Sequence, residues 1–447
     1  MTEDASARVP EKATRDEEAQ PSRGQRWSWV EPEVWTERMV AALETGVKGG
    51  KWFSLMDKVY AERTLAAAWK RVQRNGGSAG VDQQSIGAFA AQAERYLGEL
   101  RDALRGGTYR PEAVRRVWIP KPGRTEQRPL GIPTVKDRVV QTALKVVLEP
   151  IWEAEFAEQS YGFRPQRGCK DALRRVQALL DGGATWVVDV DVQGYFDSLP
   201  HDRLMQEVER RVADGAVLRL VEAYLHQGVL DGLEQWQPEQ GTPQGAVISP
   251  LLANIYLDPL DHALAEQRHQ CVRYADDMVV LCRTEEEADM VLGKLGEWMA
   301  SRGLTLHPRK TRIVDATVPG GFDFLGYHFE RGTRWPSRRS EKRLREKVRG
   351  PTRRMTSGSL DQIVGRINPI LRGWYGYFKQ SHWTTFEPLD QWVRMRLRSI
   401  LRKRAHRQGR GRGRDHQRWP NAYFQEHGLF TMAVQHRQAV RALAGYS

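Results

Sequence analysis

The sequence predicts an α/β (α+β) fold, with short strands and helices mixed over most of the chain and a helical C-terminal quarter. Three observations predict it. An apolar, β-prone run ends in an acid at 186–191, and two such runs flank a pair of acids at 271–282. Apolar faces at helical spacing, each opened by capping residues, cover 134–151 and 284–299. Helical periodicity then dominates from residue 359 to 401.

The first 135 residues are predicted to contain a disordered tail, then an N-terminal extension, then two strands and the start of a helix. Residues 1–25 are polar and mixed in charge, which predicts a disordered tail. Residues 26–115 form an N-terminal extension, with helical spacing over 61–105 that a glycine-rich stretch interrupts at 75–80. Next, Val117–Pro122 and Arg128–Pro133 predict two strands joined by a polar loop. A helix should begin at Thr134, which forms a capping box with Asp137.

Acidic residues at two strand ends suggest a metal site. Asp191 follows the apolar strand Trp186–Val190, and Asp276 and Asp277 lie at the turn of a predicted hairpin. Adjacent strand side chains point to opposite faces, so these two acids cannot face one ion equally, and a third carboxylate is needed. Asp191 supplies it, and oxygen ligands of this kind suit a pair of Mg²⁺ ions. The alternative is that Asp276 and Asp277 only form a turn.

The distribution of charge, the mean hydropathy and the cysteine positions indicate which class of protein this is. Residues 331–447 hold 27 basic and 7 acidic residues, net +20, whereas residues 1–330 hold 42 basic and 49 acidic residues, net −7. A positive field concentrated in this way predicts nucleic-acid binding, against the alternative of a solubilising basic surface. The mean hydropathy of −0.61 and the polar N-terminus predict a cytoplasmic protein without a membrane segment. Cys169, Cys271 and Cys282 are too scattered for a disulfide framework or a zinc module.

The motifs resemble a known family in their order. Asp191-x-x-x-x-Phe196, then Gln240–Gly245 with Ser249-Pro250, then Tyr274–Asp277 resemble the palm of reverse transcriptases, and most closely that of bacterial group II intron-encoded maturases. Matching blocks recur over roughly residues 70 to 430. The resemblance implies a right-hand polymerase with fingers (116–185), a palm (186–330), a helical thumb or maturase domain (331–406) and a basic RNA- and DNA-binding segment (407–447).

The resemblance also implies roles for single residues. Asp191, Asp276 and Asp277 would be the catalytic, metal-binding acids. The nucleotide-binding residues would be Lys121, Arg128, Phe196, Gln244 and Lys310, with Phe196 as a steric gate against ribonucleotides. The alternatives are surface charges for the basic residues and a core aromatic for Phe196. Ser249 and Pro250 also suit a helix start, Ser249 as N-cap. Tyr161, Phe163 and Arg164 resemble a template-contacting block, or form a structural corner.

Basic side chains in the last quarter predict an RNA-binding surface. Arg394, Arg398 and Arg402 recur at i, i+4 and i+8 opposite an apolar seam, so we expect one helix with a core face and a phosphate-facing face. A glycine-rich arm follows and should order on RNA; its arginines are Arg407, Arg410, Arg412 and Arg414.

The predicted function is RNA-templated DNA synthesis with two Mg²⁺ ions, joined to binding of an intron RNA that assists its splicing and mobility. The partners would be intron RNA, RNA template, DNA primer, dNTPs and a DNA target, with the protein a monomer or a homodimer in a nucleoid-associated ribonucleoprotein. No cysteine follows Cys282, so we expect no metal-binding endonuclease. Two alternatives stay open: a splicing-only maturase, and a reverse transcriptase domesticated for host defence or repair.

Overall fold

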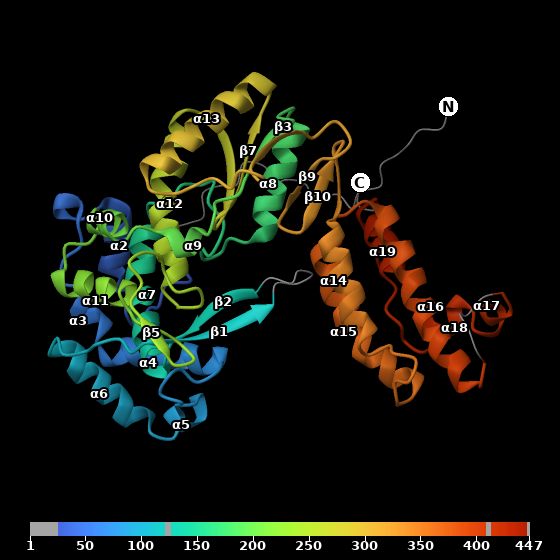
Figure 1. Cartoon of the computed structure of the whole chain (residues 1–447), viewed down its shortest axis with the longest axis horizontal. Coiled ribbons are helices and arrows are strands. Elements are labelled where there is room, and N and C mark those ends of the chain that lie inside the picture. Colours follow the sequence, from blue (N-terminus) through green and yellow to red (C-terminus); the bar gives the residue numbers. More distant parts are fainter. Residues whose placement is uncertain (1–25, 121–126, 408–412, 445–447) are drawn as a thin grey trace. The chain divides into compact units, whose positions relative to one another are not determined.

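A computed structural model describes residues 26–120, 127–407 and 413–444, and Figure 1 traces the chain. The fold consists of helices and small sheets, which confirms the predicted α/β (α+β) class. The chain divides into two compact units between Asp315 and Ala316. The predicted palm extended to residue 330, so its last fifteen residues lie in the second unit. The predicted N-terminal tail lies outside the described residues.

The first unit begins with helices that surround one long, buried helix. These are α2 (Glu37–Thr45), η1 (Lys48–Gly50), α3 (Met56–Val59), α4 (Glu62–Asn75), α5 (Ile86–Ala90) and α6 (Ala93–Arg105). The central helix is α7 (Val135–Glu153), and α3, α4 and α6 pack against it. The Thr134 hydroxyl accepts a hydrogen bond from the Asp137 amide, so Thr134 is the N-cap of α7 as predicted. The Asp137 carboxylate accepts from the Thr134 hydroxyl at 2.7 Å, and not from the Thr134 amide as in the predicted capping box. Helix α7 is buried on nearly every side, which makes it the centre of this part of the core.

The hairpin that we predicted in the fingers, β1 (Val114–Pro120) and β2 (Gln127–Ile132), belongs to a four-stranded sheet. The other strands of this sheet are β4 (Val229–Asp231) and β5 (Glu234–Trp236), and the strand order is β2-β1-β4-β5. Strands β1 and β2 are antiparallel, with Trp118 opposite Pro129, and β1 is parallel to β4. The sheet therefore joins the fingers hairpin to a second hairpin about a hundred residues further along the chain.

A second, fully antiparallel sheet carries the acidic motifs. Its strands are β3 (Trp186–Val190), β6 (Gln270–Tyr274), β7 (Asp277–Cys282) and β8 (Arg312–Asp315), in the order β6-β7-β3-β8. Helices α8, α12 and α13 pack against it. The helices of this region are α8 (Cys169–Asp181), α9 (Tyr195–Ser198), α10 (His201–Glu209), α11 (Gly215–Leu225), α12 (Ser249–Glu266) and α13 (Glu285–Ser301). The predicted strand before Asp191 and the predicted hairpin around Asp276 and Asp277 are confirmed.

The second unit has a small sheet and a helical core of its own. The sheet contains β9 (Phe322–Phe324), β10 (Tyr327–Glu330) and β11 (Thr333–Pro336), in the order β11-β10-β9. The helices are α14 (Arg338–Arg349), α15 (Leu360–Phe378), η2 (Trp383–Thr385), α16 (Phe386–Arg404), α17 (Arg414–Arg418), α18 (Asn421–Glu426) and α19 (Met432–Ala444). Apolar side chains of α14, α15, α16 and α19 share one core.

Among the described residues, no helix combines the length and the apolar character that crossing a membrane would need.

Candidate active site

The hairpin between β6 and β7 presents Asp276 at its turn. Tyr274 pairs with Asp277, so Ala275 and Asp276 form the connecting residues, and Ala275 adopts a positive φ of 60°. Desolvation raises the pKa of Asp276, and the negative charge of Asp191 raises it further, while Arg128 and Arg273 oppose the rise. Asp276 and Asp191 therefore lie within electrostatic reach of each other.

Asp191 is held through its backbone next to that hairpin. Strand β3 pairs with β7, with Val190 opposite Met278. The Asp191 carbonyl accepts hydrogen bonds from the His307 amide at 2.8 Å and from the Thr311 hydroxyl at 3.1 Å. Lys310 Nζ contacts both carboxylate oxygens of Asp191, at 3.0 and 3.2 Å. The turn before β8 thus brings a cation, distant in sequence, to the carboxylate of Asp191.

The acids fit a magnesium site as a pair rather than as a cluster of three. Over residues 26–120, 127–407 and 413–444, no three acidic, histidine or cysteine side chains lie close enough to hold one ion together. Mg²⁺ is commonly held by one or two carboxylates, with water and substrate phosphates as its other ligands. Asp191 and Asp276 supply that donor set. Asp277, at the start of β7, belongs to no such three-residue group.

A second group of predicted residues meets beside α9. Gln244 Nε2 donates to Asp197 Oδ2 at 3.4 Å, and the Gly131 amide of β2 donates to the Gln244 carbonyl at 2.7 Å. The carbonyl of Phe196 accepts from the Thr242 amide at 2.7 Å. Loop 240–245 is therefore bound both to the helix that carries Phe196 and to the fingers hairpin.

The predicted nucleotide-binding residues are partly brought together. Phe196 is half-buried and packs edge-on against Tyr195, with ring centroids 5.5 Å apart. Arg128 is exposed on β2 and lies within electrostatic reach of both Asp197 and Asp276. Lys121 lies outside the described residues. Ser249 is not the N-cap of α12, which is Ile248; its hydroxyl instead donates to the Pro243 carbonyl at 2.9 Å. The N-cap prediction was wrong because this hydroxyl fixes the loop instead.

Sequence reasoning missed a buried ion pair beneath the turn that carries Asp276. Arg273 is fully buried; its Nε donates to Asp261 of α12, and its Nη1 donates to Asn254 Oδ1 and to the Ala275 carbonyl, each at 2.9 Å. Asn254 in turn donates to the Gly162 carbonyl at 2.8 Å. A charged residue directly after the apolar pair Cys271 and Val272 of β6 was the available signal, since a buried charge requires a partner. This network fixes the position of the turn that carries Asp276.

Comparisons with known proteins decide the family. A model described as reverse transcriptase (RNA-dependent DNA polymerase) matches residues 119–329, and one described as group II intron, maturase-specific domain matches residues 341–419. The group II intron-encoded protein LtrA of Lactococcus lactis subsp. cremoris is 37% identical over 196 residues, 43% of this chain and 32% of LtrA. The chain belongs to the group II intron-encoded reverse transcriptases. This confirms the predicted family and the class of function that goes with it.

Two further similarities describe how far this group II intron-encoded reverse transcriptase matches its relatives. Protein YkfC of Escherichia coli (strain K12) is 35% identical over 328 residues, 64% of this chain and 84% of YkfC. The chain thus spans most of YkfC but only a third of LtrA. A telomerase structure from Candida albicans is 12% identical, with a TM-score of 0.42 over 80% of this chain and 66% of that chain.

The segment that resembles a template-contacting block divides into two parts. Arg164 is buried and binds Glu153 and the carbonyls of Ala157 and Ser160, so it forms a structural corner. Phe163 is 47% exposed, and its ring centroid lies 6.3 Å from that of Tyr274. The Phe163 ring is thus open to solvent beside the β6–β7 hairpin.

The predicted phosphate-facing stripe of α16 is wrong. Arg394 and Arg398 are only 4% and 2% exposed. Arg394 pairs with Glu387 at 2.7 Å, Arg398 Nε donates to the Trp419 carbonyl at 2.9 Å, and Arg402 pairs with buried Asp415. The spacing was correct, but segment 415–424 contacts Arg398 and Arg402, and Arg394 is paired within α16 itself. Of the predicted arm, Arg407 and Arg414 are exposed, and Arg410 and Arg412 lie outside the described residues.

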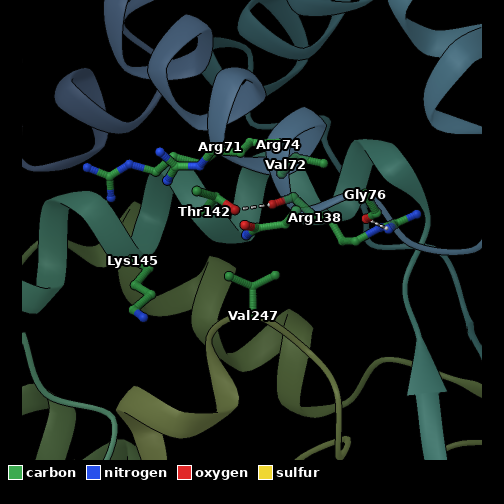
Figure 2. Close-up of a pocket in the computed structure, with 9 residues that line it drawn as sticks. Arg71, Val72, Arg74, Gly76, Arg138, Thr142, Lys145 and Val247 are labelled. Atoms are coloured by element: carbon green, nitrogen blue, oxygen red, sulfur yellow. Dashed lines mark hydrogen bonds between the residues drawn. The ribbon is translucent and has the colours of Figure 1, made fainter. Parts of the chain in front are cut away.

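A cationic pocket of about 180 Å³ lies between α4 and α7 (Figure 2). Its basic side chains are Arg71, Arg74, Arg138 and Lys145. Arg71 pairs with Glu31 at 2.9 Å and Lys145 with Glu149 at 3.3 Å. Arg138 donates to the carbonyls of Gly76 and Ser78. Of these four cations, Arg138 is therefore the one whose contacts with described residues tie the turn after α4 to α7.

Proposed function

We propose that this protein copies an RNA template into DNA and also binds an intron RNA to assist its splicing and mobility. The observation that carries the proposal is the approach of Asp191 to Asp276 beside the paired strands β3 and β7, with Lys310 bound to the Asp191 carboxylate and Arg128 within electrostatic reach of Asp276. Two bound Mg²⁺ ions would activate the primer 3′-hydroxyl and neutralise the leaving pyrophosphate. The family assignment supports the same activity.

Each residue of the proposed site has a separate task. Asp191 and Asp276 hold the metals, and Asp277 starts the strand that supports them. Lys121, Arg128 and Lys310 supply positive charge for the triphosphate, since a Lys or Arg near a phosphate stabilises the charge that develops in transfer. Gln244 orients the nucleotide, and the ring of Phe196 excludes a ribose 2′-hydroxyl.

Intron binding is assigned to the second unit. The maturase-specific model covers residues 341–419, and residues 331–447 carry a net charge of +20. Arg394, Arg398 and Arg402 of α16 are paired with other groups of the protein. We therefore place the RNA contacts at exposed basic residues, among them Arg407 and Arg414 of the predicted arm. Phosphate contacts of this kind give affinity that falls with salt.

The test replaces Asp276 by asparagine, which keeps the shape of the side chain and removes its charge. Extension of a primer on an RNA template with dNTPs and Mg²⁺ should fall by at least about a thousandfold. Thermal stability should stay the same or rise, because Asp276 is desolvated and repelled by Asp191. Asp289→Asn, an exposed change on α13, is the matched control. Wild-type extension by Asp276→Asn would refute the proposal.

A further inference from the structure

The sheet β2-β1-β4-β5 carries exposed aromatic side chains to which no function has been assigned above. Trp118 of β1 is 45% exposed and Trp236 of β5 is 36% exposed. Arg116 and Trp118 are two residues apart on β1 and therefore share a face of the sheet. Val114 pairs with Val229, which pairs with Trp236, so Trp236 lies on that same face. We call Arg116, Trp118 and Trp236 the aromatic platform.

The platform is held in place by its own contacts. The Arg116 guanidinium carbon lies 4.5 Å from the ring centroid of Trp236 and 5.6 Å from that of Trp118. Trp118 Nε1 donates to Asp231 Oδ2 at 3.0 Å. Cation–π contacts and this hydrogen bond fix both indoles although they are exposed to solvent. Large aromatic rings held rigidly at a surface lose little conformational entropy when a ligand stacks on them.

The platform adjoins the proposed nucleotide site. Arg116 pairs with Gly131 of β2, whose amide donates to the Gln244 carbonyl at 2.7 Å. The charge of Arg116 also lowers the pKa of Asp197, against the larger rise that desolvation causes, and Asp197 accepts a hydrogen bond from Gln244. Gln244 is therefore connected to the two indoles through Gly131 and its strand partner Arg116.

The chemistry of the platform suits bases rather than phosphates. Arg116 is its one cation and already lies over two rings, while Asp231 and Glu234 at the end of the β4–β5 hairpin would repel a phosphate backbone. Aromatic faces bind bases of any sequence by stacking. A ligand on this surface should therefore present unpaired bases.

We propose that the aromatic platform stacks unpaired bases of the single-stranded RNA template beside the nucleotide site. This proposal rests on the proposed function, because it assumes that the nucleotide binds beside Gln244 in loop 240–245. The platform then keeps the oncoming template extended and unpaired before it reaches the catalytic acids. A protein partner on the same tryptophans is the competing possibility.

The test is equilibrium binding, which needs no turnover. We would titrate the full-length protein against a fluorescent primer–template that is either blunt or carries several unpaired template nucleotides. The wild type should bind the overhang form more tightly. The double variant Trp118→Ala/Trp236→Ala should lose most of this preference, about tenfold in affinity for each base that no longer stacks. The slope of log affinity against log salt should not change, because no phosphate contact is removed.

Controls separate stacking from misfolding. Phe53→Ala removes another exposed aromatic of the first unit, 62% exposed, and should keep the overhang preference. Trp118→Phe/Trp236→Phe retains aromatic faces and should recover most of it. Thermal denaturation shows whether each variant is folded.

Three results would overturn the proposal: a wild type without overhang preference, a double alanine variant that retains it, or equal losses on blunt and overhang forms. Retention by the alanine variant would favour the protein partner. The same titration on Asp276→Asn should show the normal overhang preference even though extension is lost. Failure of the platform and failure of the polymerase proposal are thus separate outcomes.

Discussion

Replacing Gly162 by alanine should slow nucleotide addition by displacing the catalytic turn. A Cβ at this position would lie 2.2 Å from the Ala275 nitrogen and 2.8 Å from the Tyr274 carbonyl carbon. Real Cβ contacts are essentially never shorter than 3.0 Å, so one of the two segments must move by about 0.8 Å. A displacement near 1 Å at a reacting centre costs roughly a hundredfold in rate, and the overpacking costs about 1–3 kcal/mol of stability.

The assay is single-nucleotide incorporation at saturating primer–template and dNTP, with thermal denaturation in parallel. Gly168→Ala is the control, because the nearest atom to its new Cβ would be Asp171 Oδ2 at 3.8 Å. That control should incorporate nucleotide at close to the wild-type rate. Wild-type incorporation by Gly162→Ala, or an equal loss in Gly168→Ala, would show that the approach of Gly162 to the turn does not set the catalytic geometry.

Two further predictions concern stability. Burial raises the pKa of Asp137 to about 6, so the folded protein binds a proton there more readily than the unfolded chain, and the free energy of unfolding should fall by about 2 to 3 kcal/mol as pH rises from 4 to 6. Asp137→Asn should flatten the pH dependence of urea denaturation in that window, and an unchanged slope would contradict the assignment. Arg398→Met should lower stability by about 2 to 3 kcal/mol, because it leaves the Trp419 carbonyl and Asn421 without their donor. Exposed Arg414→Gln should instead leave the melting temperature unchanged and weaken intron RNA binding in a salt-dependent way; equal melting temperatures for the two variants would contradict the buried role of Arg398.

Local patterns in the sequence predicted local structure well. The β6–β7 hairpin, strand β3 and the Thr134 cap of α7 were predicted because apolar runs and capping residues act within a few positions of each other. The approach of Asp191 to Asp276 could also be expected, because each of these acids directly follows or lies just beyond the end of a strand of the same small sheet.

Features that depend on distant packing were not predicted. Arginines four residues apart on α16 look the same whether water or another segment covers them, and only the fold shows that segment 415–424 contacts Arg398 and Arg402. The Arg273 network likewise unites residues from positions 162, 254, 261 and 273, which no local spacing connects. Trp118 and Trp236 come together only because β1 pairs with β4, and that pairing has no signal in the sequence.

Helix α12 contacts three separate parts of the proposed site, and these contacts limit where the chain can accept an inserted residue. Ser249 at its first turn holds the Gln244 loop, the Ala253 carbonyl accepts from Tyr195 beside Phe196, and Asn254 and Asp261 bind Arg273 under the catalytic turn. One inserted residue would rotate everything beyond it by 100° and shift it by about 1.5 Å. An insertion within residues 250–261 should therefore separate the nucleotide loop from the acids, whereas a tag inserted at the exposed Gly232–Leu233 turn disturbs none of these contacts.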